Sequence, residues 1–367
     1  MPLPEMPSPH ILCLISNRFR SILILVSNSM KLAVLRKCLV LLVALPISVE
    51  AQSTMKAVVV HQYGGPEVLK YEDAPRPALK DDEMLVRVVA AGVNPVDGLI
   101  RSGLFAKYEK RTFPMILGAD ISGVVEKAGS RITKFRAGDA VYAYLHLKNN
   151  GGYAEYTLAT ESEASLKPAS LTFEEAAAVP LAAETAWQAL FDTAKLAAGQ
   201  TLLIHGGSGG VGTFAIQFAK ARGARVIATA STANQELLKE LGADVSIDYT
   251  KTRFEDVAKD VDVVMDSVGK DTLARSYAVV KKGGFIVSLV ARPDPAELEK
   301  HGIRGGPMSV DPDASELAEI TRLIEGKKVK VIVSQSYLLP DAAKAQEQAA
   351  TGHTRGKLVL KVAEPPK

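Results

Sequence analysis

The stretch TLLIHGGSGGVGTFAIQFAKARGARVIATAS, residues 201–231, decides the fold. An apolar run of strand type leads into Gly207, Gly209 and Gly212, which have the G-x-G-x-x-G spacing, and an amphipathic helical pattern follows. Glycines at this spacing permit a tight turn and a close approach of the backbone to a pyrophosphate, whose charge is met by N–H groups at the helix start. An ordinary glycine-rich turn is the alternative, but the flanking pattern favours a dinucleotide. We expect its phosphates at Gly207, Ser208, Gly209, Gly210, Val211 and Gly212.

The end of the second strand predicts which dinucleotide is bound. An Asp or Glu there would hold the ribose diol and select NAD, but Thr229, Ala230 and Ser231 are uncharged. A 2′-phosphate would therefore meet no repulsion, although no Arg or Lys follows at once. We expect NADPH rather than NADH, with hydrogen bonds to the phosphate from Ser231, Asn234 and Tyr249.

The pattern of the glycine segment continues downstream. Strand-type runs at 225–229, 244–247, 261–265, 285–289 and near 308–310 alternate with helical segments, which implies right-handed crossovers and a doubly wound parallel sheet. An Ala-rich helical region, 174–195, precedes it and is interrupted by Pro180.

The β-type runs of residues 56–160, separated by Gly, Pro and Asp, indicate an irregular antiparallel region. The tail, 329–362, has β-type runs around one helix at 339–350 and should return to that region. The expected domains are 55–180 and 328–362 together, with 181–327 between them.

Composition excludes several functions. The chain has 367 residues, 47% of them hydrophobic, enough for two domain cores. Its formal charge of +3 comes from residues 1–54, because the remainder has 39 basic and 39 acidic residues and so offers no electrostatic footprint for nucleic acid. Cys13 and Cys38 also lie in residues 1–54, so the rest of the chain contains no thiolate nucleophile or zinc ligand.

Residues 1–54 form a leader. From Met30 to Ala51 a basic start, an apolar run and small residues follow the layout of a secretory signal peptide, and the apolar run is too short for a stable membrane span. An export to the periplasm follows if this signal is genuine. If Met55 is the true start, the protein is expected in the cytoplasm; a targeting peptide of another kind, such as an organelle presequence, is the remaining alternative.

Seven motifs in order resemble the medium-chain dehydrogenase/reductase superfamily. They are MKAVVVHQYGGPEVLKYED, GVNPVDGLIRSG, LGADISGVVEKAG, GYAEYTLA, VPLAAETAWQALF, HGGSGGVG and GHTRGKLVLKV, and they cover nearly all of residues 55–362. Zinc alcohol dehydrogenases carry Cys where this chain has Asn94, and a His-Glu pair where it has Ala119 and Asp120. The resemblance is therefore to the zinc-free, quinone oxidoreductase-like branch, with a GroES-like irregular β-barrel catalytic domain and a Rossmann domain.

The resemblance also implies roles for residues. It places Asn94 near the nicotinamide ribose and the substrate, with Asp97 supporting it, and implies a homodimer. It places the cofactor's nicotinamide half against Thr185, Val268, Gly269, Leu289, Val290, Ala291 and Lys357. Quinone reductases of this branch often carry Tyr where this chain has Leu99 and Phe105, which predicts a more apolar pocket.

Other candidates have simpler interpretations. Asp97 could instead be a turn residue or a partner of Arg101, and His205 is expected to be a packed, hydrogen-bonded core residue. Tyr108 and Tyr153 could donate a proton, but aromatic residues near such strands usually serve packing.

These observations predict an NADPH-dependent reductase that transfers hydride to a small electrophile, a quinone or an α,β-unsaturated carbonyl, without zinc. A non-catalytic NADPH-binding or redox-sensing protein is the alternative, because NADPH is not expected outside the cytoplasm.

The leader yields the first test. N-terminal sequencing of the native protein should give a chain that begins after Ala51, because the small residues before that point are typical of a cleavage site. A chain that begins at Met55 and is made without cleavage would contradict export.

Overall fold

The computed structural model describes residues 53–107, 110–148 and 151–365. The expected leader, with its two cysteines, and Tyr108 therefore lie outside the described residues, except that Thr54 already begins the first strand. None of the helices in the described ranges is at once long enough and apolar enough to cross a membrane.

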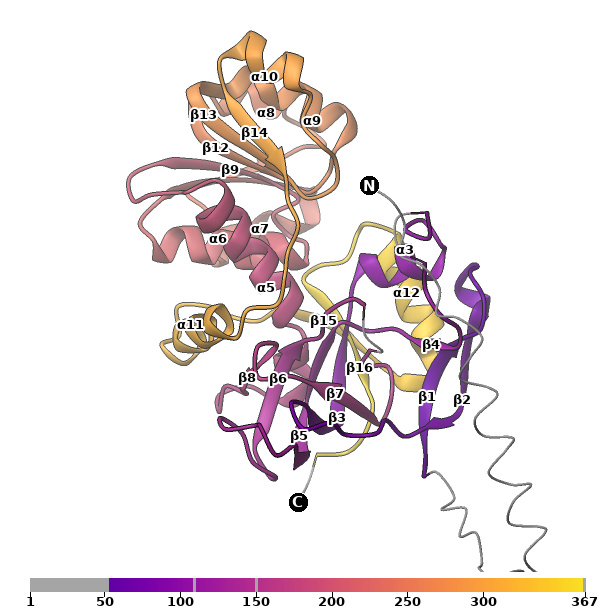
Figure 1. The fold of residues 1–367 in the computed structure, drawn as a ribbon. Coiled ribbons are helices and arrows are strands. Elements are labelled where there is room, and N and C mark those ends of the chain that lie inside the picture. The colour runs from indigo at the N-terminus through magenta and orange to yellow at the C-terminus, as the bar shows by residue number, and fades with distance from the viewer. Residues whose placement is uncertain (1–52, 108–109, 149–150, 366–367) are drawn as a thin grey trace, which may run out of the picture. The chain divides into compact units, whose positions relative to one another are not determined.

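Residues 201–307 form a six-stranded, fully parallel sheet with strand order β11-β10-β9-β12-β13-β14 (Figure 1). Strand order reverses beside β9, as in doubly wound dinucleotide-binding folds, so the prediction of a Rossmann sheet is confirmed. The strands are β9 (Thr201–His205), β10 (Arg225–Ala230), β11 (Val245–Asp248), β12 (Val261–Asp266), β13 (Val280–Ser288) and β14 (Arg304–Pro307).

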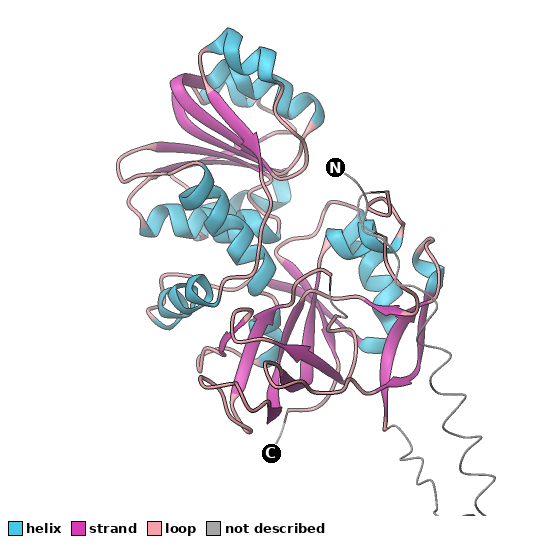
Figure 2. Ribbon diagram, in the orientation of Figure 1, coloured by secondary structure: helices cyan, strands magenta, loops and turns pink. Residues whose placement is uncertain are grey.

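Helices cover both faces of this sheet (Figure 2). Apolar side chains of α5 (Pro180–Trp187), α6 (Gly210–Ala221), α7 (Gln235–Glu240) and α11 (Ala314–Glu325) form one core with the sheet. The second core lies on the other face, under α8 (Phe254–Val257), α9 (Lys270–Ser276) and α10 (Pro295–His301). Burial on both faces explains why the inner strands β9, β10 and β12 are mostly apolar.

The last predicted strand was misplaced. We expected it near residues 308–310 because Met308 and Val310 are apolar, whereas β14 begins at Arg304 and runs through Gly305. A Cβ on Gly305 would lie 2.8 Å from the Leu298 side chain, so glycine lets α10 pack closely on the strand. Met308 instead packs against the first core.

The rest of the chain forms a mainly antiparallel lobe. A seven-stranded sheet has the order β15-β16-β3-β5-β6-β8, with β7 paired to β3, and a three-stranded sheet has the order β2-β1-β4. The strands are β1 (Thr54–Val60), β2 (Leu69–Pro75), β3 (Met84–Val93), β4 (Met115–Ile116), β5 (Asp120–Ala128), β6 (Ala140–Tyr144), β7 (Tyr156–Ala159), β8 (Ala164–Leu166), β15 (Val333–Leu338) and β16 (Lys357–Lys361). Its helices are α3 (Pro95–Arg101), α4 (Phe173–Ala177) and α12 (Ala342–Ala350).

The tail returns to this lobe, as predicted. β16 pairs antiparallel with β3, with Leu358 opposite Val93. The predicted helix 339–350 starts as a 3-10 turn, Leu339–Asp341, and becomes α12 at Ala342. The Ala-rich region is broken at Pro180, which occupies the first turn of α5, and a π-helical turn, Gln188–Thr193, continues it.

A buried carboxyl group joins α5 to α11. Glu184 is fully buried, and its Oε1 accepts a hydrogen bond of 2.8 Å from the backbone N–H of Asp313, the N-cap of α11. Its Oε2 has no hydrogen-bond partner. Burial raises the pKa of Glu184 to about 9, and neighbouring carboxylates such as that of Glu316 add to the rise. The folded protein therefore holds Glu184 protonated at neutral pH.

This group should make stability depend on pH. Because its pKa is raised on folding, its contribution is full below its ordinary pKa and is lost as the pH rises toward about 9. From about pH 5 to about pH 9, the melting temperature of Glu184→Gln should fall less than that of the wild type. Parallel falls in the two proteins would show that Glu184 is not the group responsible.

Candidate active site

The glycine turn between β9 and α6 has the predicted conformation. Gly206 has a φ of 77°, and a Cβ on Gly212 would lie 2.3 Å from the Gly206 carbonyl oxygen, so the turn and the helix can approach each other only with glycine at both places. A Cβ on Gly209 would meet only that oxygen, at 3.4 Å. The space over Gly209, the N-cap of α6, is thus open, and the N–H groups of the first turn of α6 fit a pyrophosphate. The structure brings together Gly207, Ser208, Gly209, Gly210, Val211 and Gly212.

The residues predicted to select the nucleotide also lie together. Ser231 follows β10, and Asn234 Nδ2 donates to Ser231 Oγ at 3.3 Å. Tyr249 follows the neighbouring strand β11, its backbone N–H bonds to Ala230 O at 3.2 Å, and its side chain is exposed. Asp248, a carboxylate that we did not predict here, forms an ion pair of 3.3 Å with Lys251.

Two segments expected at the nicotinamide are fixed to each other. Asp266, at the end of β12, accepts hydrogen bonds of 3.0 Å and 2.9 Å from the N–H groups of Val268 and Gly269. Its other oxygen accepts a bond of 2.8 Å from Ser288 Oγ, at the end of β13. The predicted residues Val268, Gly269, Leu289, Val290 and Ala291 therefore lie at the carboxyl ends of adjacent parallel strands, where such sheets bind ligands.

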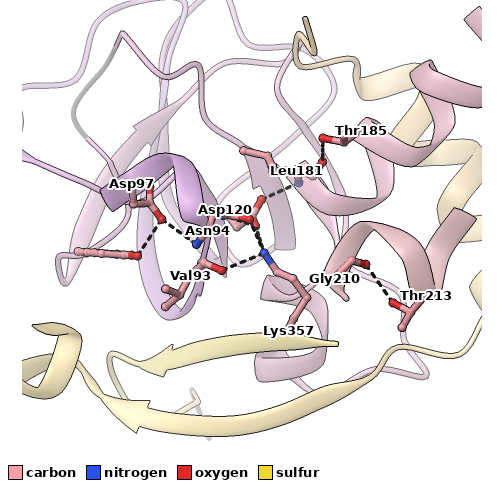
Figure 3. Close-up of polar contacts among 10 residues, drawn as sticks. Val93, Asn94, Asp97, Asp120, Leu181, Thr185, Gly210, Thr213 and Lys357 are labelled. Atoms are coloured by element: carbon pink, nitrogen blue, oxygen red, sulfur yellow. Dashed lines mark hydrogen bonds and ion pairs between the residues drawn. The ribbon is translucent and has the colours of Figure 1, made fainter. Parts of the chain in front are cut away.

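A buried network of Asn94, Asp120 and Lys357 lies where three antiparallel strands meet (Figure 3). β3 ends beside the beginnings of β5 and β16, so the register brings the three side chains together. Asn94 Nδ2 donates to Asp120 Oδ2 at 2.9 Å. The ammonium of Lys357 donates to Val93 O at 3.2 Å, to Asn94 Oδ1, and to Asp120 Oδ2 at 3.1 Å. Each charge thus has a partner, as burial requires.

Lys357 is also held close to the glycine turn. The N–H of the preceding residue, Gly356, donates to Ser208 O at 2.8 Å, and Gly356 forms a β-bridge with Gly209. A Cβ on Gly210 would lie 2.9 Å from Lys357 Cδ. The buried network and the expected phosphate site are therefore neighbours, while the predicted contact of Lys357 with the cofactor stays a prediction.

α5 contributes to the same network. Its backbone N–H at Leu181 donates to Asp120 Oδ1 at 2.6 Å. Thr185, one turn further along α5 and nearly buried, donates to Leu181 O at 2.6 Å. The predicted cofactor contact Thr185 is thus on the helix that braces Asp120.

Asp97 supports Asn94 through its backbone. Asp97 Oδ2 accepts hydrogen bonds of 2.9 Å from the Asn94 N–H and from the Tyr153 hydroxyl. Burial raises the pKa of Asp97 to about 6, with the two hydrogen bonds opposing the rise. The alternative of a partnership with Arg101 is wrong, because the Arg101 guanidinium donates to Gln346 Oε1 and Gly64 O. Tyr153 is completely buried and acts as a donor to Asp97.

A cavity of about 190 Å³ adjoins this network at Asp97 and Ala119. Its lining includes the apolar residues Ile100, Leu117 and Leu145 and the polar residues Lys110, Arg111, His146 and Lys148. Leu99 and Phe105 are not among the lining residues, and both are partly exposed. We predicted that Leu99 and Phe105 make the pocket more apolar. That prediction does not apply to this cavity, whose lining is more polar than we expected.

His205 is a core residue, as predicted. Its ring nitrogens lie 3.3 Å from Thr229 Oγ1 and 3.0 Å from Ser276 Oγ, and burial lowers its pKa to about 4. Ser276 Oγ donates its own hydrogen to Thr272 O at 2.7 Å, so the single N–H of the neutral imidazole, at Nε2, donates to Ser276 Oγ, and Nδ1 accepts from the Thr229 hydroxyl. Within the described part of the chain, no three His, Cys, Asp or Glu side chains come together as a metal site.

Sequence reasoning missed Asp120 and Asp266 as site residues. Each is an acidic residue at one end of an apolar β-type run, and such a residue must find partners when its strand is buried. The position of these two acidic residues could therefore have been noticed in the sequence, although the residues that bond to them could not.

The glycine turn, the ends of β10, β12 and β13, and the adjacent buried network define a dinucleotide-binding α/β protein with a second, β-rich lobe. Residues 80–169 match the alcohol dehydrogenase GroES-like domain, and residues 241–360 match the zinc-binding dehydrogenase family.

Known proteins narrow this class. The chain is 39% identical over 324 residues to 2-methylene-furan-3-one reductase of Solanum lycopersicum, a match that covers 85% of this chain and 80% of that protein. It is 39% identical over 317 residues to the chloroplastic NADPH-dependent alkenal/one oxidoreductase of Arabidopsis thaliana, covering 83% and 79%. The solved quinone oxidoreductase of Coxiella burnetii has a TM-score of 0.79 and 37% identity, covering 85% of this chain and all of that one. The chain belongs to the medium-chain dehydrogenase/reductase superfamily, in its quinone oxidoreductase-like branch.

Proposed function

We propose that this protein is an NADPH-dependent reductase that transfers hydride, without zinc, to a quinone or an α,β-unsaturated carbonyl compound. The observation that carries the proposal is the Lys357 ammonium bonded to Asn94 and Asp120, next to the glycine turn. The relatives named as an alkenal/one oxidoreductase, a furanone reductase and a quinone oxidoreductase support the choice of substrates.

The donor set argues against zinc. Zinc alcohol dehydrogenases bind their metal at the positions of Asn94 and Ala119, where this chain offers an amide and a methyl group. Asp120 is already paired with a buried cation at 3.1 Å. A divalent metal ion beside it would be repelled by the Lys357 ammonium, and in a buried place that repulsion is strong.

The residues present fit NADPH. The open space over Gly209 would hold the pyrophosphate, and Ser231 with Asn234 would meet a 2′-phosphate. The segments after β12 and β13 would line the nicotinamide. When bound, the reduced nicotinamide would supply the hydride, and one proton taken up from solvent would complete the reduction.

Asn94 is the side chain that we assign to the substrate or the nicotinamide ribose. Its Nδ2 donates one hydrogen bond to Asp120 and retains a second N–H. Such a donor stabilises a developing oxyanion moderately. Enones and quinones delocalise the negative charge that hydride transfer creates, so they need less polarisation than a simple ketone.

A spectrophotometric assay tests this function. The purified protein should oxidise NADPH in the presence of quinones or enones, more slowly with NADH, and equally well after treatment with a chelator. Asn94→Ala should lower kcat by about tenfold or more, because a transition-state donor is lost, while the fold is retained.

Each other result has a definite meaning. NADPH binding without acceptor-dependent oxidation would favour a non-catalytic binding protein. Equal rates with NADH would contradict the cofactor preference, and loss of activity with the chelator would contradict zinc independence. Wild-type kinetics in Asn94→Ala would refute the role of that residue.

We also propose a homodimer through β14. In the described part of the chain, β14 pairs only with β13, so its other edge is available to a second copy. A two-fold axis would pair the two β14 edges antiparallel.

The mass in solution tests the dimer, and light scattering should give twice the mass of one chain. A Cβ on Gly306 meets no atom within 4 Å, so Gly306→Lys should fold and yet dissociate the dimer by placing two charges together. A monomeric wild type would end this proposal.

A further inference from the structure

The carboxamide of Asn94 is held at both of its ends. Its Nδ2 donates to Asp120 Oδ2 at 2.9 Å, and its Oδ1 accepts from the Lys357 ammonium. A rotation that exchanged the two ends would set Nδ2 against the ammonium and Oδ1 against the carboxylate. One contact would then join two donors and the other two acceptors. Only the observed orientation of the amide allows both hydrogen bonds.

We propose that Asp120 and Lys357 are positioning residues, which fix the Asn94 amide so that its second N–H is presented to the substrate or the nicotinamide ribose. The inference rests on the function proposed above for Asn94. Among the described residues, Asn94 Nδ2 donates to Asp120 Oδ2 alone, so its second N–H has no bonded partner. The ammonium on Oδ1 also draws electron density from the amide, which makes the N–H a stronger donor.

The pair is itself held rigidly. Asp120 Oδ1 accepts from the Leu181 N–H at 2.6 Å, which prevents the carboxylate from rotating. Lys357 uses its three hydrogens on Val93 O, Asn94 Oδ1 and Asp120 Oδ2. The backbone before Lys357 is bonded to Ser208 in the glycine turn. The orientation of Asn94 is thus fixed, through Lys357, relative to the same glycine turn that would hold the cofactor's phosphates.

Asp120→Asn isolates the orientation. The new amide can still accept from Leu181 through its oxygen, but its NH₂ group then faces two donors, Asn94 Nδ2 and Lys357 Nζ. If Asn94 rotates to accept from the new amide, its own NH₂ meets the ammonium instead. We expect a lower melting temperature and a fall in kcat of about 10-fold to 100-fold. The KM for NADPH should stay within about threefold of the wild type, because the phosphate site is untouched.

The double variant Asp120→Asn with Lys357→Met separates positioning from a structural role. Without the ammonium, Asn94 can rotate and accept from the amide that replaces the Asp120 carboxylate, so the contact between these two side chains is restored but the Asn94 amide is reversed. The melting temperature should therefore recover toward the wild type, while kcat stays low. Lys357→Met alone should melt lower than the double variant, because it leaves the Asp120 carboxylate buried and unpaired.

Tyr142→Phe is the matched control. The Tyr142 hydroxyl is a buried donor to Leu317 O at 2.8 Å, away from the network, and its loss should lower the melting temperature and leave kcat unchanged. Wild-type kcat in Asp120→Asn would overturn the proposal, and so would recovery of kcat together with the melting temperature in the double variant. If the melting shift of the double variant equals the sum of the shifts of Asp120→Asn and Lys357→Met, the two residues are not coupled and the proposal is overturned. This measurement needs no substrate. A wild type that reduces no acceptor would instead refute the proposed function.

Discussion

The site depends on a single buried ion pair between Lys357 and Asp120, separated by 3.1 Å. A lysine ammonium that is removed from water carries a large desolvation cost, which is offset only when all of its donors are used. Here the register of three strands supplies the acceptors, because β16 and β5 both begin beside the end of β3. The return of the chain's last strand to its second sheet is therefore a condition of the site.

The surroundings of this ion pair explain the raised pKa of Asp97. Two carboxylates, Asp97 and Asp120, share one buried cation, and the ammonium is bonded to Asp120. Asp97 is left with a hydroxyl and a backbone N–H as donors. Burial therefore raises its pKa to about 6, with repulsion from Asp120 contributing to the rise. The pKa of Asp97 is thus raised chiefly by burial, and the ammonium, which is bonded to Asp120, offsets only a small part of the rise.

The sequence predicted the features that are local. The glycine spacing, the alternation of strands and helices and the uncharged end of β10 lie within short segments, where spacing determines geometry. β14 was misplaced because two of its four residues are glycines, which give no strand pattern, and the close packing of α10 on Gly305 is a tertiary contact that the sequence does not reveal. The network was not predicted as a unit, since Asn94 is 26 residues from Asp120 and 263 from Lys357. Only the sheet register brings such distant residues into contact.

Lys357 differs from a metal ion in a way that bears on the chemistry. A catalytic zinc ion keeps an open position for a substrate oxygen, whereas an ammonium has three hydrogens and no more. In this protein all three are bonded to Val93, Asn94 and Asp120. If Asn94 contacts the substrate as we propose, the cation acts on that substrate only through the Asn94 amide, which donates one hydrogen bond. That degree of polarisation would be too weak to ionise an alcohol, but it would suit the conjugated acceptors proposed above, which spread the incoming charge.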